Sequence, residues 1–484
     1  MFYLLFLRCV LGALGLLPIA ALAQPTSLPT TFVESLQRAQ IPLEAISVLV
    51  APADGSLPEL VSHQADVAMN PASVMKLLTT FAALELLGPA YTWRTPVWLD
   101  GPVRGGVLQG NLVIQGQGDP KLVLERLWLL LRRVQALGVL RIDGDIVLDR
   151  SAFDVPAADP GSFDGEPLRP YNASADALLV NYKAIVLTFT PDAAAGVARV
   201  QLDPPLAGVT VPLTVPLVRD KTASCGDYRN TLKPDWSDPN RIRFGGSYPA
   251  DCGEKVWPVA YADPASYNAR AITGLWRNMG GQFSGRGRDG PAPQTPPSFV
   301  MTSPTLSEVI RDVNKYSNNV MAQQLFLTLG LSTSGTAVGG APTAAATPEL
   351  ARAAINQWWQ RRISATNLPI IDNGSGLSRQ SRISAQQLGQ LLQWAYASPF
   401  MPELMASLPI VGIDGTLKRS QAAPASAHLK TGSLQGVLAR AGYVHTANGR
   451  QICLIAIVNH PNASAARPAL DALVDWVAAN GAAR

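Results

Sequence analysis

Cysteine and histidine are scarce: the 484-residue sequence has only four of each. It contains no CxxC pair and no closely spaced Cys/His pair, so a cysteine-based metal site is not expected. Charged residues are also few, at 15% of the chain, and the formal net charge is only +4. The arginines are scattered, and without a basic cluster the sequence does not predict nucleic-acid binding.

The histidines do not support a Ser-His-Asp triad. They are His63, His428, His445 and His460, and none lies in a G-x-S-x-G segment, the turn that carries the nucleophile in many hydrolases. His428 should share a strand face with Lys430. There it either lines a cleft or serves packing at the edge of the sheet.

Long hydrophobic runs are absent except at residues 1–23. This run ends in Ala21-Leu22-Ala23, the small-x-small pattern that precedes a signal-peptidase cut, so we expect cleavage after Ala23. Its only basic side chain, Arg8, lies inside the run, which leaves a membrane anchor as the alternative. The mature protein is therefore expected to be exported and soluble.

Three cysteines would remain after Cys9 leaves with the signal peptide. Cys225 and Cys252 lie in a Gly/Asp/Pro-rich region and could pair in an oxidising compartment. Cys453 lies in a strand-like run and is expected to be a buried, small apolar residue.

A chain of this length is too long for one compact core and predicts two or three domains. Strands are expected near both ends, over residues 45–51, 57–63, 427–434, 436–446 and 450–460. An Asn448-Gly449 turn joins the last two, and a helix over 467–480 closes the chain. Residues 92–283 alternate short strands with turns around one helix at 122–138. Residues 284–298 read as a flexible return linker.

A buried helix is predicted over residues 70–88, with Asn70 as its N-cap, Pro71 in the first helical position and Gly88 at its end. Its core-facing side follows the 3-4 spacing of Val74, Leu77, Leu78, Phe81 and Leu84.

Ser73 and Lys76 stand three positions apart in this helix, and Lys76 is one of only nine lysines in the chain. Residues i and i+3 share a helix face, so the hydroxyl and the amine meet. In an enclosed site desolvation lowers the pKa of the lysine, and its neutral amine can then accept the serine proton. The helix N-terminus also favours developing negative charge. Alone the pattern is weak, because about 0.6 SxxK matches are expected by chance.

A second pattern, Ser317-Asn318-Asn319, lies at the break between two predicted helices. The first of them is expected to begin with Ser303 as its cap and Pro304 in the first position. A hydroxyl and an amide at such a break can face a pocket, and helix capping is the alternative role.

A third pattern, Lys430-Thr431-Gly432, lies on the strand expected over 427–434. The glycine would let a substrate backbone come close, and the lysine would offer a positive charge to a carboxylate. A solvated lysine on an edge strand is the alternative. A KTG triplet is expected only about 0.04 times by chance in a chain of this size. The order SxxK, SxN, KTG is therefore hard to attribute to coincidence.

Together the three patterns resemble the active-site motifs of penicillin-recognising serine DD-peptidases. About 240 residues separate the first two motifs. That spacing resembles the class C low-molecular-mass penicillin-binding proteins, the D-alanyl-D-alanine carboxypeptidase/endopeptidases. Further segments similar to that family are residues 114–122, 170–182, 372–379 and 412–419. One departure is Gln323-Gln324, near which the family pattern leads us to expect an acidic residue. This departure concerns local packing more than chemistry.

The resemblance implies a role for each motif residue. Ser73 would be the acylated nucleophile and Lys76 its proton acceptor. Ser317 would relay the proton to the leaving D-alanine amine, and Asn319 would hold the substrate amide.

The third motif would bind the end of the substrate. Lys430 and Thr431 would hold its terminal carboxylate, beside Gly432. The backbone N–H groups of Ser73 and Ser433 would form the oxyanion hole. Water would then hydrolyse the acyl-enzyme, and neither a cofactor nor a metal is implied.

The implied fold is α/β (α+β): a transpeptidase-like domain whose antiparallel sheet is packed with helices. Residues 24–91 and 299–484 would form this catalytic domain, with one or two β-rich domains inserted at 92–283.

The implied function is that of a periplasmic D-Ala-D-Ala carboxypeptidase and DD-endopeptidase. It would trim peptidoglycan stem peptides and be acylated by β-lactams, and peripheral association with the cell wall or the inner membrane surface stays open. A β-lactamase-like hydrolase and a non-catalytic peptidoglycan-binding protein are the alternatives. The large insertion argues against the first. The intact Ser73, Lys76, Ser317 and Lys430 argue against the second.

Three other segments have weaker interpretations. Asp372 and Arg379 either shape the rim of the cleft or form a turn-stabilising salt bridge. Residues 116–120, GQGDP, lack the ending of a phosphate-binding loop and read as a turn. Residues 333–347 read as an exposed loop.

Overall fold

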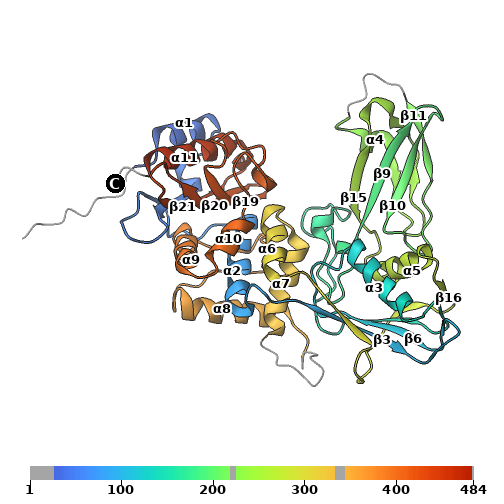
Figure 1. Ribbon diagram of the computed structural model, residues 1–484. Helices are drawn as coiled ribbons and strands as arrows, with labels where there is room; N and C mark the ends of the chain where they lie inside the picture. The colour runs from blue at the N-terminus through green and yellow to red at the C-terminus, as the bar shows by residue number, and fades with distance from the viewer. Residues whose placement is uncertain (1–26, 219–224, 333–343, 482–484) are drawn as a thin grey trace, which may run out of the picture.

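The computed structural model describes residues 27–218, 225–332 and 344–481, which form two lobes (Figure 1). One lobe contains both ends of the described chain, and the other is built from its middle. The expected signal peptide, residues 1–23, lies outside the described residues, as does most of the expected loop at 333–347. Among the described helices, none has the length and apolar character needed to cross a membrane.

The first lobe is organised by a five-stranded antiparallel sheet of order β19-β20-β21-β1-β2. Its strands are β1 (Ile46–Pro52), β2 (Val61–His63), β19 (Ala427–Leu434), β20 (Val437–His445) and β21 (Gln451–Asn459). Strands from the two ends of the chain thus share one sheet, which confirms the expected fold. The strand expected over 57–63 shortens to three residues, because Pro58 cannot donate to the ladder.

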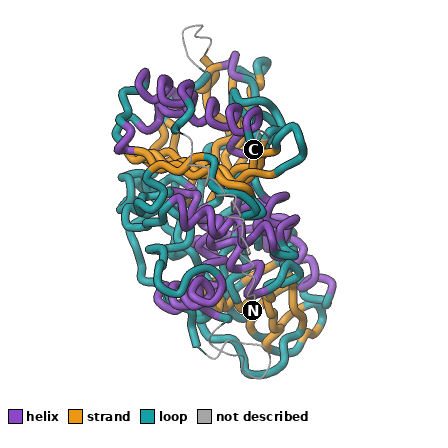
Figure 2. Tube along the Cα trace, turned by 90° about the vertical axis from the view of Figure 1, so that its left-hand side faces the viewer, coloured by secondary structure: helices purple, strands orange, loops and turns teal. Residues whose placement is uncertain are grey.

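Helices cover both faces of this sheet, and Figure 2 shows the strands lying between them. They are α1 (Thr30–Arg38), α2 (Lys76–Leu87), α6 (Leu306–Lys315), α7 (Asn319–Leu331), α8 (Pro348–Arg362), α9 (Ala385–Ala397), α10 (Met401–Ser407) and α11 (Arg467–Asn480). The first and last of them, α1 and α11, pack together on one face of the sheet. The remaining helices form a second apolar core on the other face.

The helix predicted over 70–88 begins later than expected. A 3-10 turn, η2 (Ala72–Met75), precedes α2, so Pro71 lies outside the helix instead of in its first position. Asn70 Oδ1 accepts from the backbone N–H of Ala72, and this contact ties down the entry to the turn. Gly88 ends α2 as predicted. Every residue from Lys76 to Leu84 is buried, because α2 runs through the middle of the lobe with no solvent-facing side.

The break between α6 and α7 is confirmed, but the cap of α6 is not the predicted one. Thr305 caps α6 in a capping box with Glu308. The Ser303 hydroxyl instead accepts from the backbone N–H of Trp93. Asn318 caps α7 by accepting from the Met321 N–H, so the capping alternative holds for this one member of the second motif.

The second lobe consists of short strands and three helices. Its strands are β3 (Arg94–Asp100), β4 (Val103–Arg104), β5 (Val107–Leu108), β6 (Asn111–Gln115), β7 (Arg141–Ile142), β8 (Ile146–Asp149), β9 (Ala184–Asp192), β10 (Val197–Asp203), β11 (Thr214–Val218), β12 (Pro234–Asp235), β13 (Arg243–Phe244), β14 (Tyr248–Pro249), β15 (Lys255–Ala260), β16 (Gln282–Phe283), β17 (Gly287–Asp289) and β18 (Phe299–Thr302). Its helices are α3 (Leu124–Ala136), α4 (Tyr228–Leu232) and α5 (Tyr267–Asn278). The sequence predicted α3 and missed α4 and α5.

The expected return linker contains regular structure. Within 284–298, β17 pairs with β8, and the following strand β18 pairs with β3. The returning chain therefore completes a sheet of the inserted lobe, of order β17-β8-β6-β3-β18.

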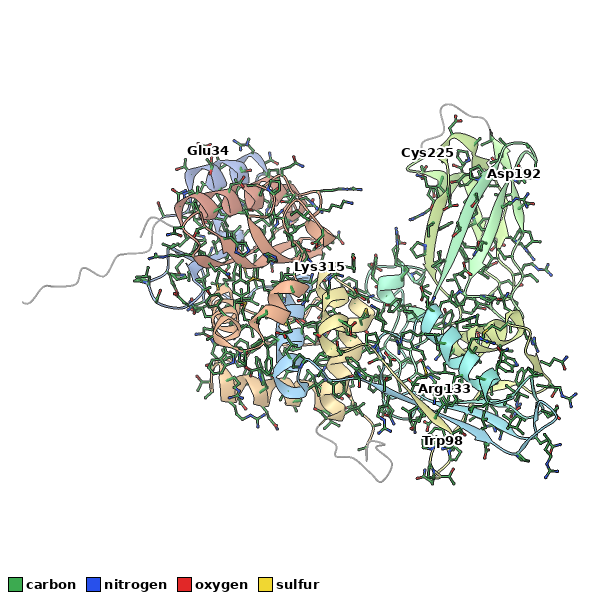
Figure 3. The ribbon with its side chains drawn as sticks, viewed as in Figure 1. Glu34, Trp98, Arg133, Asp192, Cys225 and Lys315 are labelled. Carbon is green, nitrogen blue, oxygen red and sulfur yellow. A yellow bond between two sulfur atoms is a disulfide. The ribbon has the colours of Figure 1, made fainter. Side chains whose placement is uncertain are left out.

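The sheet β14-β11-β10-β9-β15 extends away from the rest of this lobe as an arm (Figure 1). Figure 3 places Asp192 and Cys225 near its outer end. Cys225 forms a disulfide with Cys252, 27 residues away, which settles the pairing that the sequence left open. Cys453 is a free, buried thiol in the other lobe, as predicted.

Candidate active site

The three sequence motifs meet at one cleft. Its volume is about 1060 Å³, and the motif residues that line it are Ser73, Ser317, Asn319, Thr431, Gly432 and Ser433. Each motif comes from a different kind of element: the η2 turn, the α6–α7 break and strand β19. The side chains of Lys76 and Lys430 are fully buried beneath this surface, at 0% exposure.

The Lys76 amine makes three hydrogen bonds, which join the first motif to two other segments of the chain. Its Nζ lies 2.9 Å from Ser73 Oγ, 2.7 Å from Asn319 Oδ1 and 2.6 Å from the Ser375 carbonyl oxygen. The amide and carbonyl oxygens can only accept hydrogen bonds, so they take up two N–H groups of the amine. A neutral amine then directs its lone pair at Ser73. Burial, and next the charge of Lys430, holds the pKa of Lys76 well below its ordinary value, which suits a proton acceptor.

Ser317 is the second hydroxyl of the cleft, and a second buried amine contacts it. Lys430 Nζ donates to Ser317 Oγ at 2.9 Å and to the Thr431 carbonyl at 2.7 Å. Burial lowers the pKa of Lys430 to about 7. Lys430 is not among the residues that line the cleft, so its amine acts there through Ser317 and Thr431.

Two residues that position the hydroxyls of the cleft have unusual backbone conformations. Ser317 has φ 56°, and Ala72, directly before Ser73, has φ 47°. Residues other than glycine seldom adopt this left-handed region, and such strain persists only where the surroundings enforce it. Both outliers lie where the chain must turn sharply to present a hydroxyl to the cleft.

Glycines allow the strand and the loop to close around the nucleophile turn. A Cβ on Gly432 would lie 2.4 Å from the Pro71 carbonyl oxygen and 3.2 Å from the Ser73 nitrogen. Gly376, at φ +77°, would place a Cβ 2.0 Å from the Ala72 carbonyl oxygen. Only glycine lets β19 and the loop at 372–379 approach η2 this closely.

The inserted lobe forms part of the rim. Tyr171, on the 3-10 turn η3 (Pro170–Asn172), lines the cleft, and its carbonyl accepts from Asn319 Nδ2 at 3.3 Å. Phe163 also lines the cleft, and the guanidinium of Arg379 lies 5.1 Å from the centre of its ring. Arg379 donates to the Gln435 carbonyl at 2.7 Å. It therefore belongs to the rim, as one of its two interpretations predicted.

Sequence reasoning missed the contribution of Thr416, whose Oγ1 lies 2.7 Å from Thr431 Oγ1. Its loop is held by Asp414, which pairs with Lys315 Nζ at 2.5 Å. Figure 3 shows Lys315 on the side of its lobe nearer the inserted lobe. The similarity of 412–419 to the family segment was the available signal, but it did not single out one side chain.

Several other candidates lie outside the cleft. His428 Nδ1 lies 2.7 Å from His445 Nε2, which favours its packing role, and His428 does not line the cleft. Among the described residues the Arg379 guanidinium contacts Gln435 and Phe163, and no ion pair with Asp372 is present. Residues 116–120 form a bend after β6, in which Gly118 has φ +87°. Within residues 27–218, 225–332 and 344–481 no cluster of three or more His, Cys, Asp or Glu side chains could hold a metal ion.

Comparison with known proteins agrees with this geometry. Residues 31–480 match the D-Ala-D-Ala carboxypeptidase 3 (S13) family. The chain belongs to this family. An S13-family assignment confirms the resemblance seen in the three motifs.

Two curated relatives are similar over most of the S13-family region. One is the D-alanyl-D-alanine carboxypeptidase of an Actinomadura species, 29% identical over 422 residues, which cover 83% of this chain and 75% of the relative. The other is the D-alanyl-D-alanine carboxypeptidase DacB of Haemophilus influenzae, 24% identical over 404 residues, with 81% and 80% covered.

The fold is shared with a solved structure. Penicillin binding protein 4 of Haemophilus influenzae superposes with a TM-score of 0.70 at 22% identity, covering 93% of this chain and 100% of that one. The same protein has been solved in complex with a β-lactam, at a TM-score of 0.67. The inserted lobe is thus part of the shared fold.

Proposed function

We propose that this protein is a serine-type D-Ala-D-Ala carboxypeptidase that also acts as a DD-endopeptidase on peptidoglycan stem peptides and is acylated by β-lactams. The observation that carries the proposal is the buried Lys76 amine. Two of its N–H groups are held by Asn319 and Ser375, and its third contact is the Ser73 hydroxyl. The names of both curated relatives and the β-lactam complex of the structural relative support the same activity.

Acylation begins when Ser73 Oγ attacks the carbonyl carbon of the penultimate D-alanine, while the hydroxyl proton passes to Lys76 Nζ. The C–N bond of the scissile amide then breaks, and its electron pair stays on the leaving nitrogen. That nitrogen takes up the proton, which Lys76 returns through the Ser317 hydroxyl. An ester between Ser73 and the shortened peptide remains.

The buried amine of Lys430 supports this relay. It contacts Ser317 Oγ at 2.9 Å and can hold the hydroxyl in position as the proton passes. Water then attacks the ester carbonyl, the C–O bond breaks, and Ser73 recovers its proton. No step requires a group from outside the chain and its substrate other than water.

Substrate positioning is assigned to the remaining motif residues. The Asn319 side chain would hold the substrate amide, and the backbone N–H groups of Ser73 and Ser433 would stabilise the oxyanion. The Thr431 hydroxyl, with the positive charge of Lys430 behind it, would attract the terminal carboxylate. Gly432 would let the substrate backbone run alongside β19.

The cellular setting belongs to the same proposal. Residues 1–23 would be a cleaved signal peptide, and the mature enzyme would work in the periplasm on the cell wall. Peripheral association with the wall or the inner membrane surface is compatible with this setting. Residues 24–91 and the chain after β18 would form the catalytic domain. The inserted domains would extend from residue 92 to the end of β18, past the boundary at 283 expected from the sequence, because β17 and β18 pair within the inserted lobe.

A fluorescent penicillin tests the nucleophile. We expect covalent labelling of the wild type, none of Ser73→Ala, and full labelling of the control Ser237→Ala, whose hydroxyl contacts Asp235 in the inserted lobe. A labelled Ser73→Ala protein would overturn the assignment of the nucleophile, and an unlabelled wild type would favour a non-catalytic binding protein. Rapid release of hydrolysed drug would favour a β-lactamase.

Products formed from a defined cross-linked muropeptide separate the two peptidase activities. Free D-alanine measures carboxypeptidase action, and loss of the cross-linked dimer measures endopeptidase action. An enzyme that is labelled by penicillin but yields neither product would contradict the peptidase proposal.

A further inference from the structure

The substrate of the proposed reaction ends in a carboxylate. The third motif has one cation, Lys430, and its amine is not exposed in the cleft where that carboxylate would lie. Lys430 is 0% exposed, and its amine is engaged by Ser317 Oγ and the Thr431 carbonyl. Because burial also lowers its pKa to about 7, Lys430 carries less than a full charge at neutral pH. The cleft therefore needs another cation near Thr431 to hold a carboxylate firmly.

Arg440 occupies that place. It lies on β20 directly opposite Thr431 in the antiparallel register of β19 and β20. Directly opposed residues project from the same face of a sheet, with their Cβ atoms about 4.5–5.5 Å apart. Arg440 is also buried, at 6% exposure, but unlike Lys430 it lines the cleft, as Thr431 does. An arginine and a threonine thus extend from neighbouring positions of one sheet face, at the point where the substrate should end.

The guanidinium is held in one orientation. Arg440 Nη1 donates to Asp471 Oδ1 on α11 at 2.7 Å. The same carboxylate accepts from Ser420 Oγ at 2.5 Å and from the Gln421 N–H at 3.2 Å, so Asp471 is itself fixed. In the part of the chain that the structure describes, this is the one side-chain hydrogen bond of Arg440. An arginine has five N–H groups, so donors remain for a ligand.

The surrounding charge favours an anion. Asp471 offsets one positive charge, but Arg467 also lines the cleft, and its repulsion contributes to lowering the pKa of Arg440, after the larger effect of burial. Arg419 lines the cleft as well. At the other end of the cleft Arg379 is engaged with Gln435 and Phe163. Asp475 lines the α11 end of the cleft too, so the three arginines of that end outnumber its two carboxylates by one. A small excess of positive charge therefore remains near Thr431.

We propose that Arg440, together with Thr431, binds the C-terminal carboxylate of the substrate and thereby positions the scissile amide at Ser73. The proposal rests on the peptidase function given above and names the group that recognises a free carboxylate. Asp471 is the positioning residue, since it aims the guanidinium. Lys430 then serves Ser317, and direct charge recognition belongs to Arg440.

The test compares two substrates, a peptide ending in D-Ala-D-Ala and the same peptide with its terminal carboxylate converted to the carboxamide. For each enzyme kcat/KM is measured on both. The ratio of the two values does not depend on how much of the preparation is folded. We expect the wild type to prefer the acid, and Arg440→Gln to lose about 10- to 100-fold on the acid with little change on the amide.

Two further variants complete the test. Arg440→Lys keeps the charge without the planar fork, so its acid-to-amide ratio should fall between those of Arg440→Gln and the wild type. Arg199→Gln breaks an arginine–aspartate pair on the distant arm, with Asp192 at 2.8 Å, and should keep the wild-type ratio.

The outcomes are distinguishable. A wild-type ratio in Arg440→Gln, with both substrates still cleaved, would overturn the proposal and leave the peptidase function standing. A wild type that cleaves neither substrate would overturn the peptidase function itself. If Arg440→Gln yields no folded protein, the acid-to-amide ratio of Arg440→Lys decides: an unchanged ratio in that variant contradicts the proposal.

Discussion

Among single side chains, Lys76 and Lys430 carry the proposed chemistry and should also set part of the pH dependence of stability. Both are fully buried, and burial favours their neutral forms. In an unfolded chain lysine stays protonated up to a pH of about 10.4. Between the folded and unfolded pKa values the unfolded state therefore holds more protons, so stability should rise with pH. The cost of burying the amine is therefore largest at low pH and falls as the pH rises through the folded pKa.

Lys430→Met isolates this effect. With a folded pKa of about 7, Lys430 should make the wild type gain about 1 kcal/mol of unfolding free energy per pH unit between pH 7 and 8.5, relative to the variant. Urea unfolding at the two pH values measures the difference. Lys233→Met, an exposed position in the inserted lobe, should run parallel to the wild type. If the unfolding free energies of the wild type and Lys430→Met change with pH in parallel, the Lys430 amine stays charged in the folded wild type.

Among the elements, the contact between strand β19 and the 3-10 turn η2 decides where Ser73, the proposed nucleophile, lies. The strand brings Gly432 against Pro71 and Ser73, and the loop at 372–379 brings Gly376 against Ala72. The turn is thus enclosed by two glycine backbones, neither of which directs a side chain at it. This close packing explains how a strained turn holds the Ser73 hydroxyl beside the Lys76 amine.

Gly432→Ala tests that contact. Its Cβ would lie 2.4 Å from a backbone oxygen of Pro71, so the strand or the turn must shift by several tenths of an ångström. We expect acylation by penicillin to slow by about tenfold or more, because small displacements of reacting groups are costly. The control Gly245→Ala meets no atom closer than 3.7 Å and should acylate normally. Unchanged acylation in Gly432→Ala would show that β19 and η2 can move apart without displacing Ser73.

Across the whole molecule, the inserted lobe is joined by hydrogen bonds to helix α7, which carries the proposed site residue Asn319. Helix α7 begins at Asn319 and contains Gln324. Gln324 Oε1 accepts from the Asp176 N–H at 2.8 Å, and its Nε2 donates to the carbonyls of Asp176 and Gly118. Asp176 is itself buried and paired with Lys183 at 2.8 Å. The departure noted at Gln323-Gln324 is therefore the junction between the lobes.

Gln324→Glu tests the junction. A carboxylate cannot donate to the two carbonyl oxygens, and it would add a negative charge next to the buried Asp176. We expect a loss of about 2–4 kcal/mol in unfolding free energy, measured by urea denaturation. The neighbouring Gln323→Glu, at a partly exposed position with no side-chain contact of this kind, should cost less than about 0.5 kcal/mol. Equal losses in the two variants would contradict a specific role for Gln324.

The local parts of this protein could be predicted from its sequence. Ser73 and Lys76 meet because residues three apart share a face, and the Asn448-Gly449 hairpin and helix α11 follow from turn chemistry and apolar spacing. The same reasoning misplaced the start of α2, because the 3-10 turn that presents Ser73 is enforced by Gly376 and Gly432 from distant segments.

Tertiary structure alone decided the rest. No local pattern in the sequence predicts contacts such as that between Lys76 and Asn319, which are 243 residues apart. The burial that lowers the pKa of Lys430, and the register that sets Arg440 opposite Thr431, likewise exist only once the strands have paired. Short-range spacing determines which groups share a helix turn or a strand face. Packing between distant segments determines which of those groups lose water, and so which of them carry charge.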